Sequence, residues 1–439
     1  MKSPKTHPAA VAEDTREEAR AASRAERDWS SVFYRVALSI SRELDLERLL
    51  WLIMDEVRQA LEADRCTVFL WDEDTDELWA LAAHGAEEIR FPASLGIAGH
   101  VLRTGEVLNI PDAYNDPRFN PAIDRETGYR TRSILTAPLR NHVGETIGVF
   151  QVLNKESGPF TREDELLLDA ISGIAATQIE NARLYAELKD SFESFVETLA
   201  SIIDARDPET AGHSKRLALY CEELARLLDL SAQDTEKLRI AALLHDYGKI
   251  AVREAILYKA DALTEDEQES MRNHPVFTRR ILEEIHFPKT LRDVPQIAAA
   301  HHERLDGSGY PDGLTGEGIP PLARLLAVVD VFDAMTSRRS YRGRMDLRDV
   351  MEELRRGRGR LYDARFVEAL EQLSVARFLE ILNDGELSFV SSADREVLSG
   401  LDLRTLVNLL NTNVPTPEVR LFERYYLPDE TQGCENGQT

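Results

Sequence analysis

Cysteine is scarce in this sequence, and its three cysteines do not form a paired motif. Cys66, Cys221 and Cys434 lie far apart in a chain of 439 residues. No disulfide framework is therefore expected, and a reducing compartment fits best. The N-terminus has no apolar signal segment, and no run approaches the roughly 18 apolar residues of a membrane span. These absences predict a cytoplasmic protein without a membrane partner.

Positive charge is also in short supply. The chain has 53 Lys and Arg against 78 Asp and Glu, which gives a net charge of −25. A chain of this charge is repelled by nucleic-acid polymers and anionic membranes, so both are excluded as generic partners. If the substrate is a phosphate ester, metal ions and lysines or arginines in the pocket must offset the repulsion between its negative charge and that of the protein.

The length predicts two or three domains, because one hydrophobic core rarely serves so many residues. Five segments are expected along the chain. They are an N-terminal helical or flexible segment (1–28), a mixed module (29–185), a connecting helix that overlaps both neighbours (171–203), a nearly all-helical module (191–382) and a partly disordered C-terminal extension (383–439).

The first module mixes helical and strand patterns. Residues 46–54 read as an amphipathic helix, and the alternating run 65–71 is typical of a half-buried strand. Further strands are expected at 78–83, 133–139 and 145–154, followed by a helix from about Arg162. An antiparallel sheet flanked by helices is an α+β domain.

The connecting segment carries a heptad seam over more than four heptads. One interpretation is a single long helix that packs on its own domain. The other is a parallel two-stranded signalling helix, in which polar Gln178 and Asn181 help to fix the register. The seam consists of Ile171, Ile174, Gln178, Asn181, Tyr185, Leu188, Phe192, Phe195, Leu199 and Ile202.

Five of the ten histidines form a spaced set with two aspartates. Imidazole and carboxylate hold borderline divalent metals around an activated water, so the set predicts a hydrolase. Asp246 follows an apolar helix and is the natural bridge between two metals, while a bare carboxylate at Asp330 in an apolar run is costly unless paired. Each histidine alone would more often be an ordinary core residue. The set is His213, His245, Asp246, His274, His301, His302 and Asp330.

Several ordered motifs in the second module resemble the HD-GYP family, a branch of the HD metal-dependent phosphohydrolases. The resemblance implies an all-α domain that binds two or three divalent metals, iron or manganese. It also implies hydrolysis of cyclic di-GMP to pGpG or GMP by a metal-activated hydroxide. The motifs are R-D-P-E-T-A-G-H (206–213), H-D-Y-G-K (245–249), N-H-P (273–275), H-H-E-R-L-D-G-S-G-Y-P (301–311), D-V-F-D-A-M-T-S (330–337) and Y-R (341–342).

The same resemblance assigns roles to individual residues. One metal would be held by His213, His245, Asp246 and Asp330, and its neighbour by Asp246, His274, His301 and His302. Glu209, four residues before His213, would add a third metal; the alternative is a solvated surface acid. Asp246 and Lys249 would be the catalytic pair. Substrate contacts would come from Lys249, Tyr310, Arg339 and Arg342; Tyr310 could instead be structural or face a partner.

Two alternatives remain for the second module. A related branch hydrolyses cyclic GMP-AMP, and a non-catalytic receptor would bind a cyclic dinucleotide without turnover. Glu303 is expected to orient other groups and not to bind metal. A protein partner could dock at the Gly307 to Pro311 loop.

The first module resembles a GAF domain. Its residues Asn154, Lys155, Phe160, Asp164 and Glu165 match the N-K-x(n)-F-x(3)-D-E pattern of cyclic-nucleotide-binding GAF domains. The lysine and an acid could form a salt bridge that holds the pocket together without touching a ligand. The module would either bind cAMP or cGMP or serve as an unliganded or differently liganded dimerisation module. A homodimer through this module and the connecting helix is expected.

Overall fold

The computed structural model describes residues 31–80, 89–121, 124–125, 128–207, 212–259, 261–338, 343–383, 390–412 and 414–426. The N-terminal segment 1–28 lies outside these ranges. The chain divides into two units after Ser191, and each is described by itself below. Among the described helices, none combines the length and the apolar character needed to cross a membrane.

The first unit is built on a six-stranded sheet of order β3-β2-β1-β6-β5-β4, in which all paired neighbours are antiparallel. The central pair runs from Ala63 opposite Lys155 to Leu70 opposite Gly148. Only the last residue of β5 is exposed, because both faces of the sheet are covered. The strands are β1 (Ala63–Asp72), β2 (Glu77–Ala80), β3 (Ile89–Pro92), β4 (Leu108–Ile110), β5 (Ile134–Arg140) and β6 (Thr146–Lys155).

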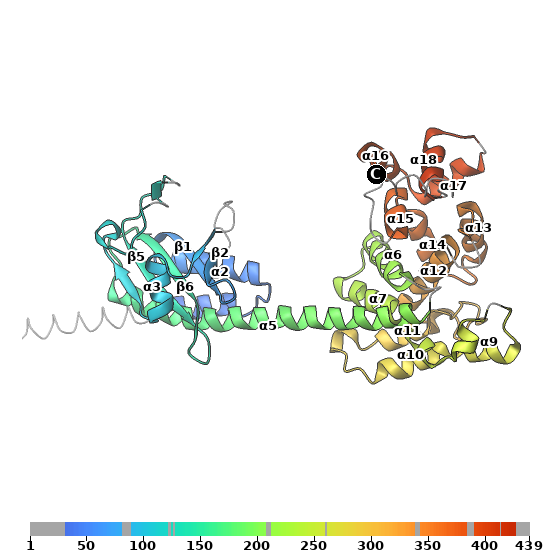
Figure 1. Cartoon of the computed structure of the whole chain (residues 1–439), viewed down its shortest axis with the longest axis horizontal. Coiled ribbons are helices and arrows are strands. Elements are labelled where there is room, and N and C mark those ends of the chain that lie inside the picture. Colours follow the sequence, from blue (N-terminus) through green and yellow to red (C-terminus); the bar gives the residue numbers. More distant parts are fainter. Residues whose placement is uncertain are drawn as a thin grey trace, which may run out of the picture. The chain divides into compact units, whose positions relative to one another are not determined.

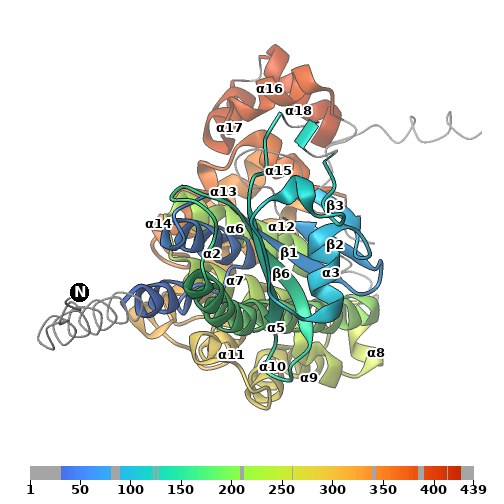
Figure 2. The same ribbon diagram turned by 90° about the vertical axis from the view of Figure 1, so that its left-hand side faces the viewer.

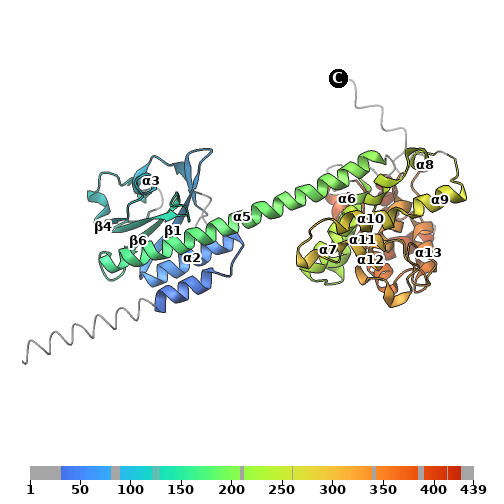
Figure 3. The same cartoon turned by 90° about the horizontal axis from the view of Figure 1, so that it is seen from below.

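Helices cover the two faces of this sheet. Helix α3 (Gly96–Thr104) lies on one face, and α2 (Leu46–Ala60) and the start of α5 (Arg162–Arg206) lie on the other (Figure 2, Figure 3). Apolar residues at spacings of three and four place one face of α2 in the core, and the Asp45 side chain caps its first turn. Residues 31–40 are also helical. The predicted α+β domain is confirmed.

Helix α5 is a single helix of 45 residues (Figure 1). Its first part contributes Leu168, Ile171 and Ile179 to the core of the first unit, and its last part contributes Val196 and Ala200 to the core of the second. Between these parts the predicted seam is uncovered within the described chain. The side chains of Tyr185 and Leu188 are 53% and 70% exposed.

The second unit is helical, as predicted. Buried aromatic and aliphatic side chains of α6, α7 and α12 form the centre of its core, with Tyr220 and Phe332 in edge-to-face contact. The helices are α6 (His213–Leu227), α7 (Ala232–Leu244), α8 (Glu254–Leu257), α9 (Glu265–Arg272), α10 (His274–Glu283), α11 (Val294–Ala299), α12 (Pro321–Thr336), α13 (Leu347–Gly357), α14 (Ala364–Glu371), α15 (Val375–Leu382), α16 (Ser392–Ser399), α17 (Leu403–Asn411) and α18 (Pro417–Tyr426).

The C-terminal extension contains three helices within the described residues. Helices α16, α17 and α18 all pack on the core of the second unit. The buried Glu371 carboxylate accepts hydrogen bonds from Arg355 and from Arg404 of α17. The Tyr426 hydroxyl of α18 donates to the carbonyl of Met345.

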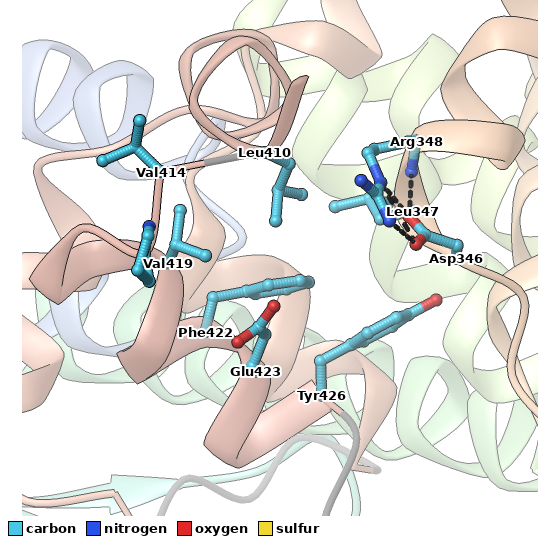
Figure 4. Close-up of a pocket in the computed structure, with 10 residues that line it drawn as sticks. Asp346, Leu347, Arg348, Leu410, Val414, Val419, Phe422, Glu423 and Tyr426 are labelled. Carbon is cyan, nitrogen blue, oxygen red and sulfur yellow. Dashed lines mark hydrogen bonds and ion pairs between the residues drawn. The ribbon is translucent and has the colours of Figure 1, made fainter. Parts of the chain in front are cut away.

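A pocket of about 230 Å³ lies between this extension and the start of α13 (Figure 4). Leu410, Phe422 and Tyr426 give it apolar walls, and the ion pair of Asp346 and Arg348 lies at its edge. None of the residues that line it belongs to the predicted metal set.

Candidate metal centre

Five parts of the second unit bring the seven predicted histidines and aspartates together. His213 and His274 begin α6 and α10, and Asp330 lies inside α12. The His245-Asp246 pair lies where α7 ends, and the His301-His302 pair lies in the turn after α11. Helix ends and a turn allow adjacent residues to point to the same group of ligand atoms, which one helical face would not. The side chains form two groups whose potential ligand atoms lie within 4.8 Å of one another: His213, His245 and Asp330, and Asp246, His274, His301 and His302.

Asp246 lies between the two groups. One of its oxygens, Oδ2, is 3.3 Å from Nε2 of His245, and the other, Oδ1, is 3.1 Å from Nε2 of His274. The same Oδ1 is 3.8 Å from Nε2 of His301. A carboxylate whose two oxygens face different histidine sets has the geometry of a bridging ligand.

Three of the histidines share one arrangement. Nδ1 of His245, His274 and His301 lies 2.8, 2.8 and 2.6 Å from the backbone carbonyl three residues earlier. A carbonyl only accepts, so Nδ1 carries a proton in each ring, and Nε2 is the nitrogen that can bind a ligand when the ring is neutral. All three Nε2 atoms are buried and have no hydrogen-bond partner among the described residues.

These orphaned nitrogens test whether a metal fits the site. Leaving a buried acceptor unpaired costs about 1–3 kcal/mol, so three together are a large penalty unless something binds them. Neutral imidazole nitrogens next to a buried carboxylate are the donor set for borderline divalent metals. The residues present therefore fit a metal centre.

His213 is held differently. Its Nε2 is 3.3 Å from Oδ1 of Asp330, and its Nδ1 is 2.7 Å from Oδ2 of Asp333. Burial would lower the pKa of His213, but the hydrogen bonds to Asp330 and Asp333 raise it to about 9. The Arg216 guanidinium in turn donates from Nε and Nη2 to the two oxygens of Asp333, at 2.8 and 3.0 Å.

Neither Arg216 nor the role of Asp333 was predicted from the sequence. The available signal was the spacing of D-V-F-D, which places Asp330 and Asp333 on one face of α12. The partner arginine lies 117 residues away in the sequence, so no local pattern could reveal it. An outer carboxylate that fixes the orientation of a ligand histidine is common at metal sites.

The two adjacent histidines are kept neutral. Burial lowers the pKa of His301 well below its ordinary value and that of His302 to about 3. Burial would raise the pKa of Asp246, but His245 and Lys249 hold it well below its ordinary value. Neutral imidazoles and an ionised carboxylate are the forms that bind metal.

Lys249 is already paired on both sides. Its ammonium lies 2.8 Å from Oδ2 of Asp246 and 3.0 Å from Oδ2 of Asp207, a buried carboxylate that sequence analysis did not single out. Burial would lower the pKa of Lys249, but the two aspartates raise it above its ordinary value. The lysine is therefore cationic and anchors Asp246.

Gly248 explains part of the H-D-Y-G-K motif. A Cβ at this position would lie 2.0 Å from the carbonyl oxygen of His274, so only glycine allows the approach. The Gly248 N–H donates to Oγ1 of Thr278, whose hydroxyl donates to the carbonyl of His245. These contacts lock the two histidine-bearing segments together.

The Gly307 to Pro311 loop packs directly on the His301-His302 turn. The Glu303 carboxylate accepts hydrogen bonds from the backbone N–H of Asp312 and Leu314, at 2.8 and 2.9 Å, and so holds the loop. A Cβ on Gly309 would lie 2.5 Å from Cα of Glu303. The Tyr310 N–H donates to the carbonyl of His302, and the two ring centroids are 4.6 Å apart.

Burial, together with Asp246 and Asp330, raises the pKa of Tyr310 to about 12. Its phenol therefore stays protonated at neutral pH. Three other predicted site residues, Glu209, Arg339 and Arg342, lie outside the described residues.

In the first unit, the motif residues hold three segments together. Lys155 at the end of β6 pairs with Asp164 of α5 at 2.5 Å, and both side chains are largely buried. The Asn154 amide accepts from the N–H of Arg132 at 2.6 Å and donates to the carbonyl of Arg130 at 2.9 Å. Its φ of 57° lies in the left-handed region, which asparagine tolerates better than most residues.

The remaining two motif residues, Phe160 and Glu165, both accept hydrogen bonds from the side-chain amide of Asn109. Nδ2 of Asn109 donates to the carbonyl of Phe160 at 2.8 Å and to Glu165 at 2.9 Å. The Phe160 side chain is buried in the core. All five motif residues therefore make internal contacts between β6, α5 and the neighbouring strands.

The two units match two different protein families. Residues 45–179 match the GAF domain, and residues 197–366 match the HD domain. The chain contains a GAF domain followed by an HD domain. The predicted resemblance to both is confirmed. An HD domain implies divalent-metal binding, and the histidine and aspartate groups described above fit it.

Three curated relatives are similar to this chain. The 3'3'-cGAMP-specific phosphodiesterase 2 of Vibrio cholerae is 36% identical over 207 residues, which are 47% of this chain and 40% of that protein. The cyclic di-GMP phosphodiesterase response regulator RpfG of Xanthomonas campestris is 40% identical over 191 residues, 43% of this chain and 50% of that protein.

The cyclic di-GMP phosphodiesterase of Thermotoga maritima is 37% identical over 189 residues, 43% of this chain and 51% of that protein. The chain thus spans about half or less of the length of these curated relatives.

Proposed function

We propose that the chain is a metal-dependent phosphodiesterase that hydrolyses cyclic di-GMP to pGpG or GMP. The single observation that carries the proposal is the set of three buried, unpaired Nε2 atoms grouped around the two-sided carboxylate of Asp246. Relatives named as cyclic di-GMP phosphodiesterases give the substrate class.

The site would hold two divalent metals, iron or manganese. His213, His245 and Asp330 would bind one, and His274, His301 and His302 the other, with Asp246 between them. When bound, the metals supply an activated water and neutralise charge on the phosphoryl oxygens. Glu209 would add a third metal, so Glu209→Ala should remove at most that one.

Other residues of the chain would orient the metal ligands and offset the negative charge of the substrate. Arg216 and Asp333 fix the ring of His213, and Lys249 holds Asp246 while it offsets phosphate charge. Tyr310 would contact substrate from the loop that Glu303 holds. Arg339 and Arg342 would grip the phosphates, as bidentate guanidinium groups do.

A homodimer would form along α5. Four uncovered apolar residues, Tyr185, Leu188, Phe195 and Ile202, follow one another at spacings of three, seven and seven. That repeat matches one edge of a two-stranded coiled coil, and a second copy of this chain would cover it. The Gly307 to Pro311 loop, where Ser308 is exposed, is the proposed surface for a protein partner.

The GAF domain would regulate the HD domain, either by binding cAMP or cGMP or as a dimerisation module. The internal contacts of all five motif residues support a role in holding the domain together. Calorimetry with cAMP and cGMP separates the two possibilities, because only a sensor gives heat below millimolar ligand.

A specific observation favours a second candidate substrate. Three relatives, 36% to 40% identical, are named as 3'3'-cGAMP-specific phosphodiesterases. Turnover of cyclic di-GMP and 3'3'-cGAMP, measured side by side with Fe(II) or Mn(II) under anaerobic conditions, decides between them. Chromatography of the products identifies pGpG or GMP. Binding without turnover of either dinucleotide would instead indicate a receptor.

A further inference from the structure

Arg272 lies beside the metal centre without belonging to it. It is the last residue of α9, and its guanidinium is 5.8 Å from the centroid of the Tyr310 ring. The preceding carbonyl, that of Met271, accepts the hydrogen bond from Nδ1 of His274. The Tyr310 ring in turn lies 4.6 Å from the ring of His302. One aromatic ring therefore links Arg272 to the metal-binding histidines.

The Arg272 side chain is exposed and has no ion pair within the described part of the chain. Arg279, on the next helix, pairs with Asp312 at 2.8 Å. The contact with the Tyr310 ring leaves N–H groups of the Arg272 guanidinium available to an anion.

A simpler explanation is that Arg272 stabilises the C-terminal end of α9 through the helix dipole. Arg280 lies in the last turn of α10 and is also exposed, but within the described residues no aromatic ring lies under its guanidinium. The helix dipole would stabilise both arginines. Of the two, only Arg272 also contacts the Tyr310 ring, which lies against the ring of His302.

We propose that Arg272, supported by the Tyr310 ring, binds the phosphate of the cyclic dinucleotide that is not being cleaved. This inference rests on the proposed function. The cleaved phosphate would lie against the metal ligands and Lys249, whose ammonium is 2.8 Å from Oδ2 of Asp246. The second phosphate would lie outside that centre, where the planar guanidinium of Arg272 adds to the contacts proposed above for Arg339 and Arg342.

The test compares Arg272→Ala and Arg272→Lys with the matched control Arg280→Ala. Each full-length variant is titrated with a slowly hydrolysed phosphorothioate analogue of cyclic di-GMP, and its kinetics are measured on cyclic di-GMP and on bis(4-nitrophenyl) phosphate, which has one phosphate. Arg272→Ala should raise Kd and KM for the dinucleotide by about tenfold or more, as expected for one lost charged contact.

The single-phosphate substrate should be hydrolysed by Arg272→Ala at the wild-type rate, and metal content should not change. Arg272→Lys should recover part of the dinucleotide affinity, whereas Arg280→Ala should match the wild type. An unchanged Kd in Arg272→Ala, or an equal loss in Arg280→Ala, would overturn the inference. A wild-type chain that binds the analogue without hydrolysing cyclic di-GMP would overturn the proposed function alone.

Discussion

The two units each contain a buried cluster of charged residues, and the clusters differ in what they leave unpaired. In the GAF domain, Lys155 and Asp164 complete each other, and Asn154 uses both ends of its amide on the backbone. In the HD domain, three buried histidines each keep one nitrogen without a partner among the described residues. A cluster in which every group is paired stabilises the fold. A cluster that leaves buried imidazole nitrogens without a partner requires a bound ligand such as a metal ion.

The largest expected effect follows from removing the shared carboxylate. Asp246→Asn should lower turnover by more than about a hundredfold, because loss of even a residue that only supports a metal ligand lowers metal affinity or activity by about 10–100-fold. The variant should lose its bound metal and keep its fold. Metal analysis together with circular dichroism checks this, and a variant with near-wild-type activity would show that the site is assigned wrongly.

The second prediction removes the buried ion pair between Lys155 and Asp164 in the first unit. Asp164→Asn leaves the Lys155 ammonium buried without its counter-charge and should destabilise the GAF domain by about 3–5 kcal/mol. All four tryptophans, Trp29, Trp51, Trp71 and Trp79, precede Ser191, so their fluorescence in urea reports on this unit alone. Metal content should stay at the wild-type level. A stability equal to the wild type would contradict the structural role.

A smaller effect is expected from the outer carboxylate of the metal centre. Asp333→Asn keeps the size of the side chain but weakens its bonds to His213 and Arg216, so metal affinity should fall by about 10–100-fold. Competition with a chelator of known affinity measures the change. Affinity within twofold of the wild type would show that Asp333 does not support the centre.

The smallest effect on stability is expected along α5. Leu188→Lys changes a side chain that is 70% exposed in the single chain, so unfolding should shift by no more than about 0.5 kcal/mol. If a second copy covers the seam, the same variant should dissociate the dimer in sedimentation experiments. Glu187→Lys, at the neighbouring exposed position outside the seam, is the control and should remain dimeric.

Much of this comparison was accessible from the sequence. The long strands β1, β5 and β6 and helix α5 follow from their periodicity, and the seven candidate metal ligands follow from spaced motifs. The short strands β3 and β4, with four and three residues, carry no periodic signal.

The contacts that decide chemistry were less accessible, because they join distant segments. Asp207 lies 42 residues from Lys249, and Arg216 lies 117 residues from Asp333. The shared backbone contact of His245, His274 and His301 depends on where each helix or turn ends, which sequence patterns place only to within a few residues. That contact is what distinguishes a metal centre from a set of buried histidines.

The metal content of the purified chain tests the central claim most directly. Protein prepared anaerobically with Fe(II) or Mn(II) should contain two or three metals per chain, should lose them in Asp246→Asn and should keep them in Asp164→Asn. Fewer than two metals per chain in the wild type, or equal metal content in Asp246→Asn, would contradict the account.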